Sequence, residues 1–277
     1  MLIKTYQSKC HLIYLCLDFG IWLAKICKLG RCKRKKREML PPDKHLTIGS
    51  MLFPGLDQID LTGPFEVLSA IPNSTLHVAA KTRSPIKDFH GLSLVADMTY
   101  DEVPELDVLH VPGGPGQQAL MEDEETLDFI RKHASKATYV FSVCTGALLC
   151  GAAGLLRGKK ATTHWASQHL LPYFGATPVD QRVVIDGNWV FAAGVTSGID
   201  GALHLAALLR GQPVAEQIQL YMQYHPEPPF DAGTPDRAPK QVLENARNAV
   251  GKLTADRLAT AKKISAKLGV EVPGLVG

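Results

Sequence analysis

The chain has 277 residues, of which 45% are apolar and 21% are charged, enough for one large α/β domain or two small ones. This composition is typical of a globular protein with a substantial core and excludes a disordered chain. The formal net charge is +3, but residues 31–37 carry six positive charges, so the remainder sums to −3. The body of the chain therefore lacks the basic surplus that favours nucleic acid as a partner.

The six cysteines are too few and too scattered for a disulfide framework, and four of them lie within residues 10–32. Only Cys144 and Cys150 remain in the body of the chain. Because the sequence has neither a C-x-x-C pair nor an H-E-x-x-H motif, no metal site is predicted. We expect the body to be a reduced, cytoplasmic protein.

Residues 1–44 differ from the rest and are interpreted as an N-terminal extension. Residues 11–29 are mainly apolar, but Asp18 and Lys25 interrupt them, and the basic run follows. A membrane anchor is one interpretation, although a central Asp costs roughly 2.5–3.5 kcal/mol on insertion scales. A secretory signal would carry its basic residues before the apolar part. We favour a start at Met39, with 1–38 an upstream translation artefact or a tail, and we expect no membrane partner.

From His45 onward, short apolar strands alternate with amphipathic helices. Strands are predicted at residues 46–53, 75–80, 106–111, 138–143 and 161–164, with a hairpin-like excursion at 86–96 and a strand pair, 182–185 and 189–193. Helices are predicted at residues 61–71, where Thr62 is a possible cap, and at 117–137. One further helix is predicted to begin at residue 145 and another to end at residue 171. Three more are predicted at 197–210, 214–224 and 240–268.

This alternation predicts an α/β fold, a doubly wound, mostly parallel sheet with helices on both faces, as in flavodoxin-like proteins. We expect a catalytic domain at 45–235 and a C-terminal helical extension at 236–277. Ligands bind such sheets beyond the carboxyl ends of the strands. Three unusual segments, 53–60, 112–114 and 144–146, lie at predicted strand ends and together predict a site.

Cys144 follows a buried strand directly and is followed by small residues, the context of a nucleophile elbow. A thiol at a helix N-terminus is close to unpaired N–H groups, which favour the thiolate, and the N–H of Thr145 could stabilise a developing anion. The alternative is a buried cysteine that packs as a small apolar residue, as we expect for Cys150.

The glycine pair Gly113-Gly114 follows another buried strand and would let the backbone approach a reacting atom, with its N–H groups as a second set of anion donors. The alternative is an ordinary tight turn. Asp60 lies between Ile59 and Leu61, an apolar setting that should raise the pKa of its carboxyl. Its alternative role is a helix N-cap. His164 is a candidate partner for the cysteine or a satisfied histidine beside its neighbouring Trp, and spacing does not decide between them.

Five segments together resemble the isonitrile (isocyanide) hydratase branch of the ThiJ/PfpI superfamily, which shares the class I glutamine amidotransferase-like fold. They are FP…QIDLTGP (53–64), VPGG (111–114), SVCTG (142–146), ATTHW (161–165) and PPFDAG (228–233). Many members of the wider superfamily have a histidine after the cysteine and a glutamate as the carboxylate. The Thr145 and Asp60 of this chain count against peptidase and deglycase activity and fit the hydratase branch.

The resemblance implies that Cys144 is the nucleophile and Asp60 its acid–base partner, in a cofactor-free enzyme acting on a small molecule and assembled as a homodimer. An isonitrile would form a thioimidate on Cys144 and be released as an N-substituted formamide, with the amides of Gly114 and Thr145 steadying the developing charge. The natural isonitrile depends on the shape of the pocket, which the sequence does not give.

Two other functions stay open. The same domain occurs in AraC-type regulators, but residues 240–277 contain one long helix, too little for two helix-turn-helix units. A free-standing ligand sensor would bind a small molecule without turning it over. A redox-sensing protein would oxidise Cys144 to the sulfinic acid as its purpose.

Overall fold

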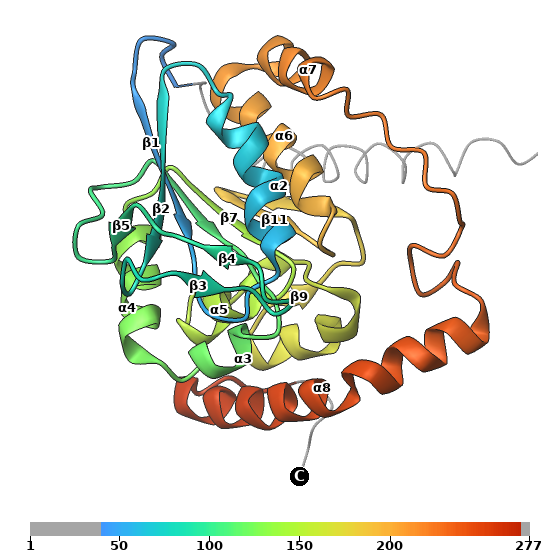
Figure 1. The fold of residues 1–277 in the computed structure, drawn as a ribbon. Helices are drawn as coiled ribbons and strands as arrows, with labels where there is room; N and C mark the ends of the chain where they lie inside the picture. Colours follow the sequence, from blue (N-terminus) through green and yellow to red (C-terminus); the bar gives the residue numbers. More distant parts are fainter. Residues whose placement is uncertain (1–39, 273–277) are drawn as a thin grey trace, which may run out of the picture. The chain divides into compact units, whose positions relative to one another are not determined.

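A seven-stranded sheet forms the centre of the computed structural model, which describes residues 40–272 (Figure 1). Its strand order is β10-β11-β7-β6-β1-β2-β5, and each neighbouring pair is parallel except β10 with β11. The strands are β1 Leu46–Met51, β2 Ser74–Ala80, β5 Met98–Thr99, β6 Val108–Val111, β7 Tyr139–Val143, β10 Val183–Asp186 and β11 Trp189–Ala192. The N-terminal extension and the hypotheses on its apolar stretch lie almost wholly outside the described residues.

Two small strand pairs lie outside this sheet. One is an antiparallel hairpin, β3 (Ile86–Lys87) with β4 (Ser93–Leu94), which confirms the excursion predicted there. The other is parallel, β8 (Lys160–Ala161) with β9 (Thr177–Pro178).

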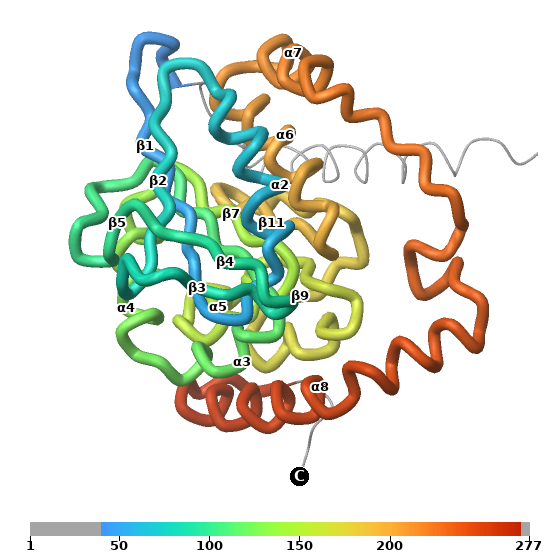
Figure 2. The backbone as a smooth tube through the Cα atoms, viewed as in Figure 1, coloured from blue at the N-terminus to red at the C-terminus, as the bar shows by residue number. Residues whose placement is uncertain are grey.

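Helices cover both faces of the sheet, as the alternating pattern predicts. One face carries α2 (Gln58–Ser69) and α6 (Ser197–Arg210), with α7 (Gln212–Tyr221) packed on α6. The other carries α3 (Gln117–Leu120), α4 (Glu124–Ala134), α5 (Gly146–Ala152), the 3-10 helix η1 (Trp165–Phe174) and α8 (Lys240–Leu268). Figure 2 shows a long segment without helix or strand that leads from α7 to α8, at the opposite end of the view.

The core consists of two apolar clusters, one on each side of the sheet. All five residues of β7 are buried, which explains why this strand is apolar on both of its faces apart from Ser142 and does not alternate with exposed polar residues. Leu148 and Phe174 belong to the cluster under α5 and η1, and Leu205 belongs to the cluster under α6. None of the helices within residues 40–272 combines the length and the apolar character that crossing a membrane requires.

Several predicted boundaries differ from those observed, two of them for a clear local reason. Helix α2 begins at Gln58, three residues earlier than predicted, because the side chain of Asp57 accepts a hydrogen bond from Ile59 N at 3.1 Å and caps it. The predicted helix 117–137 is two helices, because Asp123 caps a new start by accepting from Thr126 N at 2.9 Å. The strand expected to run to residue 164 ends at Ala161.

Candidate active site

The carboxyl ends of β1, β6 and β7 bring the three predicted segments together. The N–H of Gly113, after β6, donates to Asp60 Oδ2 at 3.0 Å, in a buried contact across 53 positions of sequence. The N–H of Gly114 donates to Thr145 Oγ1 at 3.1 Å, which joins the same loop to the residue after Cys144. The spatial convergence inferred from strand ends is therefore present in the structure.

Cys144 occupies the sharp turn between β7 and α5. Its φ is +53°, a left-handed conformation that is rare for residues other than glycine and marks a strained elbow. The turn is held on both sides, since Cys144 N donates to Ala192 O at 3.0 Å and Thr163 Oγ1 donates to Cys144 O at 2.7 Å. A Cβ added at Gly146 would lie 2.0 Å from Val111 O, so the turn needs the small residue that follows.

Asp60 lies in the first turn of α2, and its side chain is fully buried. Because Asp57 caps the helix, the carboxyl of Asp60 is not used for capping, and it points at the Gly113 loop instead. Its Oδ1 atom is buried without a hydrogen-bond partner among the described groups. Burial raises the pKa of Asp60 to about 8, with a further rise from Asp57, while the Cys144 thiol and the Gly113 N–H act in the opposite direction.

The thiol of Cys144 is 5% exposed and interacts directly with the Asp60 carboxyl. Burial raises the pKa of Cys144 well above its ordinary value, and negative charge on Asp60 raises it further. The Thr145 N–H lowers the pKa, as expected at a helix N-terminus, but burial outweighs it. We call Cys144 and Asp60 the thiol–carboxyl pair; near neutral pH its two groups hold their protons more tightly than free side chains do.

The hydroxyl of Thr145 bridges both backbone groups of Gly114. It accepts from Gly114 N at 3.1 Å and donates to Gly114 O at 3.2 Å. The N–H of Gly114 is therefore already used, which corrects the expectation that it is a free donor for a developing anion. The N–H of Thr145 is the backbone donor that acts on the thiol.

His164 caps η1 and is not part of the thiol–carboxyl pair. Its Nδ1 accepts from Ala166 N at 3.4 Å, and its ring lies tilted on Trp165 with 5.4 Å between centroids. Burial first, and then the charge of Arg257, lower the pKa of His164 to about 4, so its ring is neutral at neutral pH. This favours the satisfied-histidine interpretation and leaves Asp60 as the partner of Cys144.

Arg257 is the residue of this region that sequence reasoning missed. It belongs to α8, its side chain is buried, and its Nη2 donates to Gly114 O at 3.0 Å. It follows Leu253 by four positions and precedes Ala261 by four, so it interrupts an apolar helical stripe with a charge. That interruption is the one sequence signal that could have pointed to it.

Cys150, the other described cysteine, is fully buried in the core under α5, as predicted. Within the described part of the chain, no group of three or more His, Cys, Asp or Glu side chains is placed to hold a metal ion. The site itself presents a buried thiol, a buried carboxyl and the backbone N–H of Thr145.

Comparisons with known proteins find relatives of this chain. The profile described as the DJ-1/PfpI family matches residues 48–208. The isonitrile hydratase of Pseudomonas putida is 49% identical over 225 residues, which cover 81% of this chain and 99% of that protein. A deglycase of Pyrococcus horikoshii is 32% identical over 136 residues, covering 48% of this chain and 81% of that protein. The crystal structure of a ThiJ/PfpI family protein from Pseudomonas syringae has a TM-score of 0.77 and 37% identity, covering 83% of this chain and 98% of that one.

Proposed function

This chain belongs to the DJ-1/PfpI family, and we propose that it is an enzyme that hydrates isonitriles to N-substituted formamides. The observation that carries the proposal is the thiol–carboxyl pair, a cysteine in an elbow beside a carboxyl that keeps its proton at neutral pH. The hydratase of Pseudomonas putida supports it, because its similarity to this chain spans nearly its whole length.

The first step uses both members of the pair. The step starts from the singly charged form of the pair, in which Cys144 has lost its proton and Asp60 keeps its own. The thiolate Sγ of Cys144 forms a bond to the terminal carbon of R–N≡C, and the Asp60 carboxyl transfers its proton to that carbon. The product is a thioimidate, R–N=CH–S–Cys144, with Asp60 left as a carboxylate. The Thr145 N–H donates toward the sulfur and steadies the charge while the bond forms.

In the second step water adds across the C=N bond. The Asp60 carboxylate takes a proton from the water and passes it to the nitrogen, which gives a tetrahedral carbon bearing OH, NHR and sulfur. The C–S bond then breaks, the hydroxyl proton returns to Asp60, and the formamide R–NH–CHO leaves. The burial of Asp60 beside Cys144 supports this role, since it holds the carboxylate next to the sulfur that carries the reacting carbon.

The test is formamide production from cyclohexyl isocyanide by the full-length chain, followed by mass spectrometry. We expect Cys144→Ala to abolish turnover and Cys150→Ala, a matched loss of a buried thiol, to retain it. Tight binding of the isonitrile without formation of product would favour the ligand-sensor hypothesis over the enzyme hypothesis. Turnover by Cys144→Ala at the wild-type rate would refute the mechanism.

The proposal also includes a cytoplasmic homodimer. Leu220, Tyr221 and Phe230 are about four-fifths exposed, and we expect a second copy to cover part of this apolar area. A reducing compartment would keep the Cys144 thiol available. Light scattering coupled to gel filtration would show twice the mass of one chain, and a monomer would contradict this part of the proposal.

A further inference from the structure

Arg257 reaches the candidate site from α8, outside residues 48–208 that match the family profile. Its side chain is 4% exposed, and its Nη2 donates to Gly114 O at 3.0 Å. The same carbonyl accepts from the hydroxyl of Thr145 at 3.2 Å. The guanidinium is therefore fixed beside the loop that carries Gly113 and next to the residue that follows Cys144.

The charge of this guanidinium has no carboxylate partner within residues 40–272. None of the ion pairs there includes Arg257, and its Nε atom is buried without a hydrogen-bond partner. A guanidinium stays protonated in proteins, and a buried charge is costly unless an opposite charge offsets it. Burial lowers the pKa of Arg257, and the charge of the Cys144 sulfur, once its proton is lost, acts in the opposite direction.

The other titratable groups around the thiol–carboxyl pair supply no positive charge at neutral pH. Asp57 is acidic and raises the pKa of Asp60. Burial lowers the pKa of His110 to about 3 and that of His164 to about 4, so both rings are neutral. Among the groups that influence the Cys144 thiol, Arg257 is the cation.

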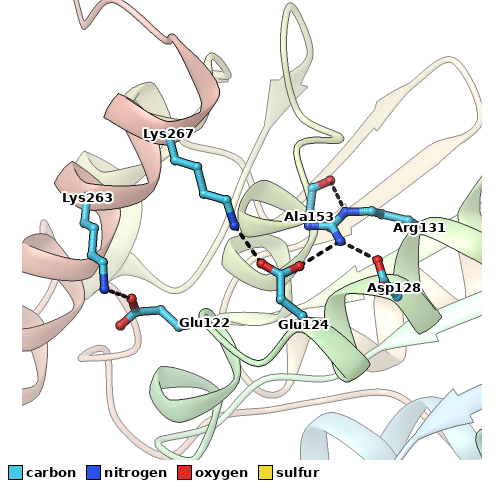
Figure 3. Close-up of polar contacts among 7 residues, drawn as sticks. All are labelled: Glu122, Glu124, Asp128, Arg131, Ala153, Lys263 and Lys267. Carbon is cyan, nitrogen blue, oxygen red and sulfur yellow. Dashed lines mark hydrogen bonds and ion pairs between the residues drawn. The ribbon is translucent and has the colours of Figure 1, made fainter.

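Ion pairs hold helix α8 against the neighbouring helix, in the position that directs Arg257 inward. Lys263 pairs with Glu122, and Lys267 pairs with Glu124 at 2.7 Å (Figure 3). Glu124 is shared with Arg131 at 3.1 Å, so the C-terminal half of α8 is tied to the start of α4. The position of the guanidinium is thus set by contacts two to three turns along the helix.

We propose that Arg257 is a positioning residue that stabilises the singly charged state of the thiol–carboxyl pair, in which Asp60 keeps its proton and Cys144 has lost its own, so that Cys144 can attack a neutral electrophile. The inference rests on the proposed hydration for its substrate class, and on the buried, unpaired guanidinium for its role. One negative charge shared by sulfur and carboxyl, offset by one fixed positive charge, leaves the buried site close to neutral. Without Arg257, both groups would hold their protons over a wider range of pH.

The test is the pH dependence of Cys144 alkylation by iodoacetamide in the full-length chain, with the modified peptide quantified by mass spectrometry. An opposite charge at close range shifts a pKa by about 1–3 units, so Arg257→Met should move the alkylation midpoint upward by that amount. Alkylation at pH 7 should then slow by about tenfold or more. Arg257→Lys should restore most of the shift, and Lys252→Met, which removes a 90% exposed cation of the same helix, should cause none.

Circular dichroism and thermal unfolding accompany each variant. If Arg257→Met does not fold, Arg257→Gln carries the test, because it keeps a donor for Gly114 O without the charge. An unchanged midpoint in a folded variant overturns the role of Arg257. Because alkylation uses no isonitrile, a chain that fails to hydrate isonitriles but shows the shift would refute the proposed function and leave this inference standing.

Discussion

Replacing Asp60 by Asn should change how the stability of the fold depends on pH. Asp60 is fully buried, and burial raises the pKa of its carboxyl from 3.8 to about 8. A carboxyl with a raised pKa binds its proton more tightly in the folded chain than in the unfolded one. Stability is therefore lost as the pH rises from the unfolded to the folded pKa, the reverse of an ordinary paired carboxylate.

The size of the effect follows from the two pKa values. At pH 5 the pH lies about one unit above the pKa of this carboxyl in the unfolded chain, and at pH 7.5 it lies more than three units above. The carboxyl in the folded chain remains mostly protonated at both pH values. With 1.36 kcal/mol for each unit, the penalty grows by about 3 kcal/mol between pH 5 and pH 7.5. Asn carries no proton to lose, so Asp60→Asn should remove this dependence.

Unfolding of wild type and Asp60→Asn by guanidinium chloride at pH 5 and pH 7.5 measures the difference in unfolding free energy directly. Contributions from titrating groups that do not interact with Asp60 cancel when the two chains are compared at each pH. We expect the variant to gain about 3 kcal/mol relative to wild type over this interval while losing hydratase activity. A stability difference that is the same at both pH values would refute the buried, protonated carboxyl and the proton transfer built on it.

Three further changes test the surroundings of the pair. Gly113→Ala should lower activity at least tenfold, because the new Cβ would lie 2.5 Å from Thr145 N; Gly233→Ala, which meets nothing within 4 Å, should not. Thr145→Val leaves the N–H of Gly114 buried without an acceptor, so unfolding free energy should fall by about 1–3 kcal/mol in chemical denaturation. Lys267→Met removes an exposed ion pair, so thermal unfolding should shift by no more than a few degrees, less at high salt.

Those parts of the site that follow from local pattern were predictable. The apolar strand before Cys144 and the small residue after it predict the elbow, and the φ of +53° agrees with that. The release of Asp60 from capping was not predictable, since Asp57, Asp60 and Thr62 all offer a capping side chain. Only the position of the first helical turn decides among them, and sequence patterns fix helix ends within a few residues at best.

Arg257 marks the other limit of sequence reasoning. Its contact with Gly114 joins positions 143 residues apart, and it depends on how α8 docks after a long segment without regular structure. A charged residue in an apolar stripe indicates that something buried offsets it, but not what. The sequence therefore predicts the strand-end half of the site and leaves the half supplied by α8 undetermined.

The burial of Cys144 and Asp60 also bears on the redox-sensing alternative. A redox-sensing cysteine reacts as an exposed thiolate of low pKa. Cys144 is 5% exposed, and burial raises its pKa, so oxidants would meet it slowly and mostly as a thiol. A sensor also has no use for the proton that Asp60 retains at neutral pH, whereas the proposed hydration delivers that proton to carbon. The buried carboxyl that costs stability at this site is therefore the group that the proposed hydration uses.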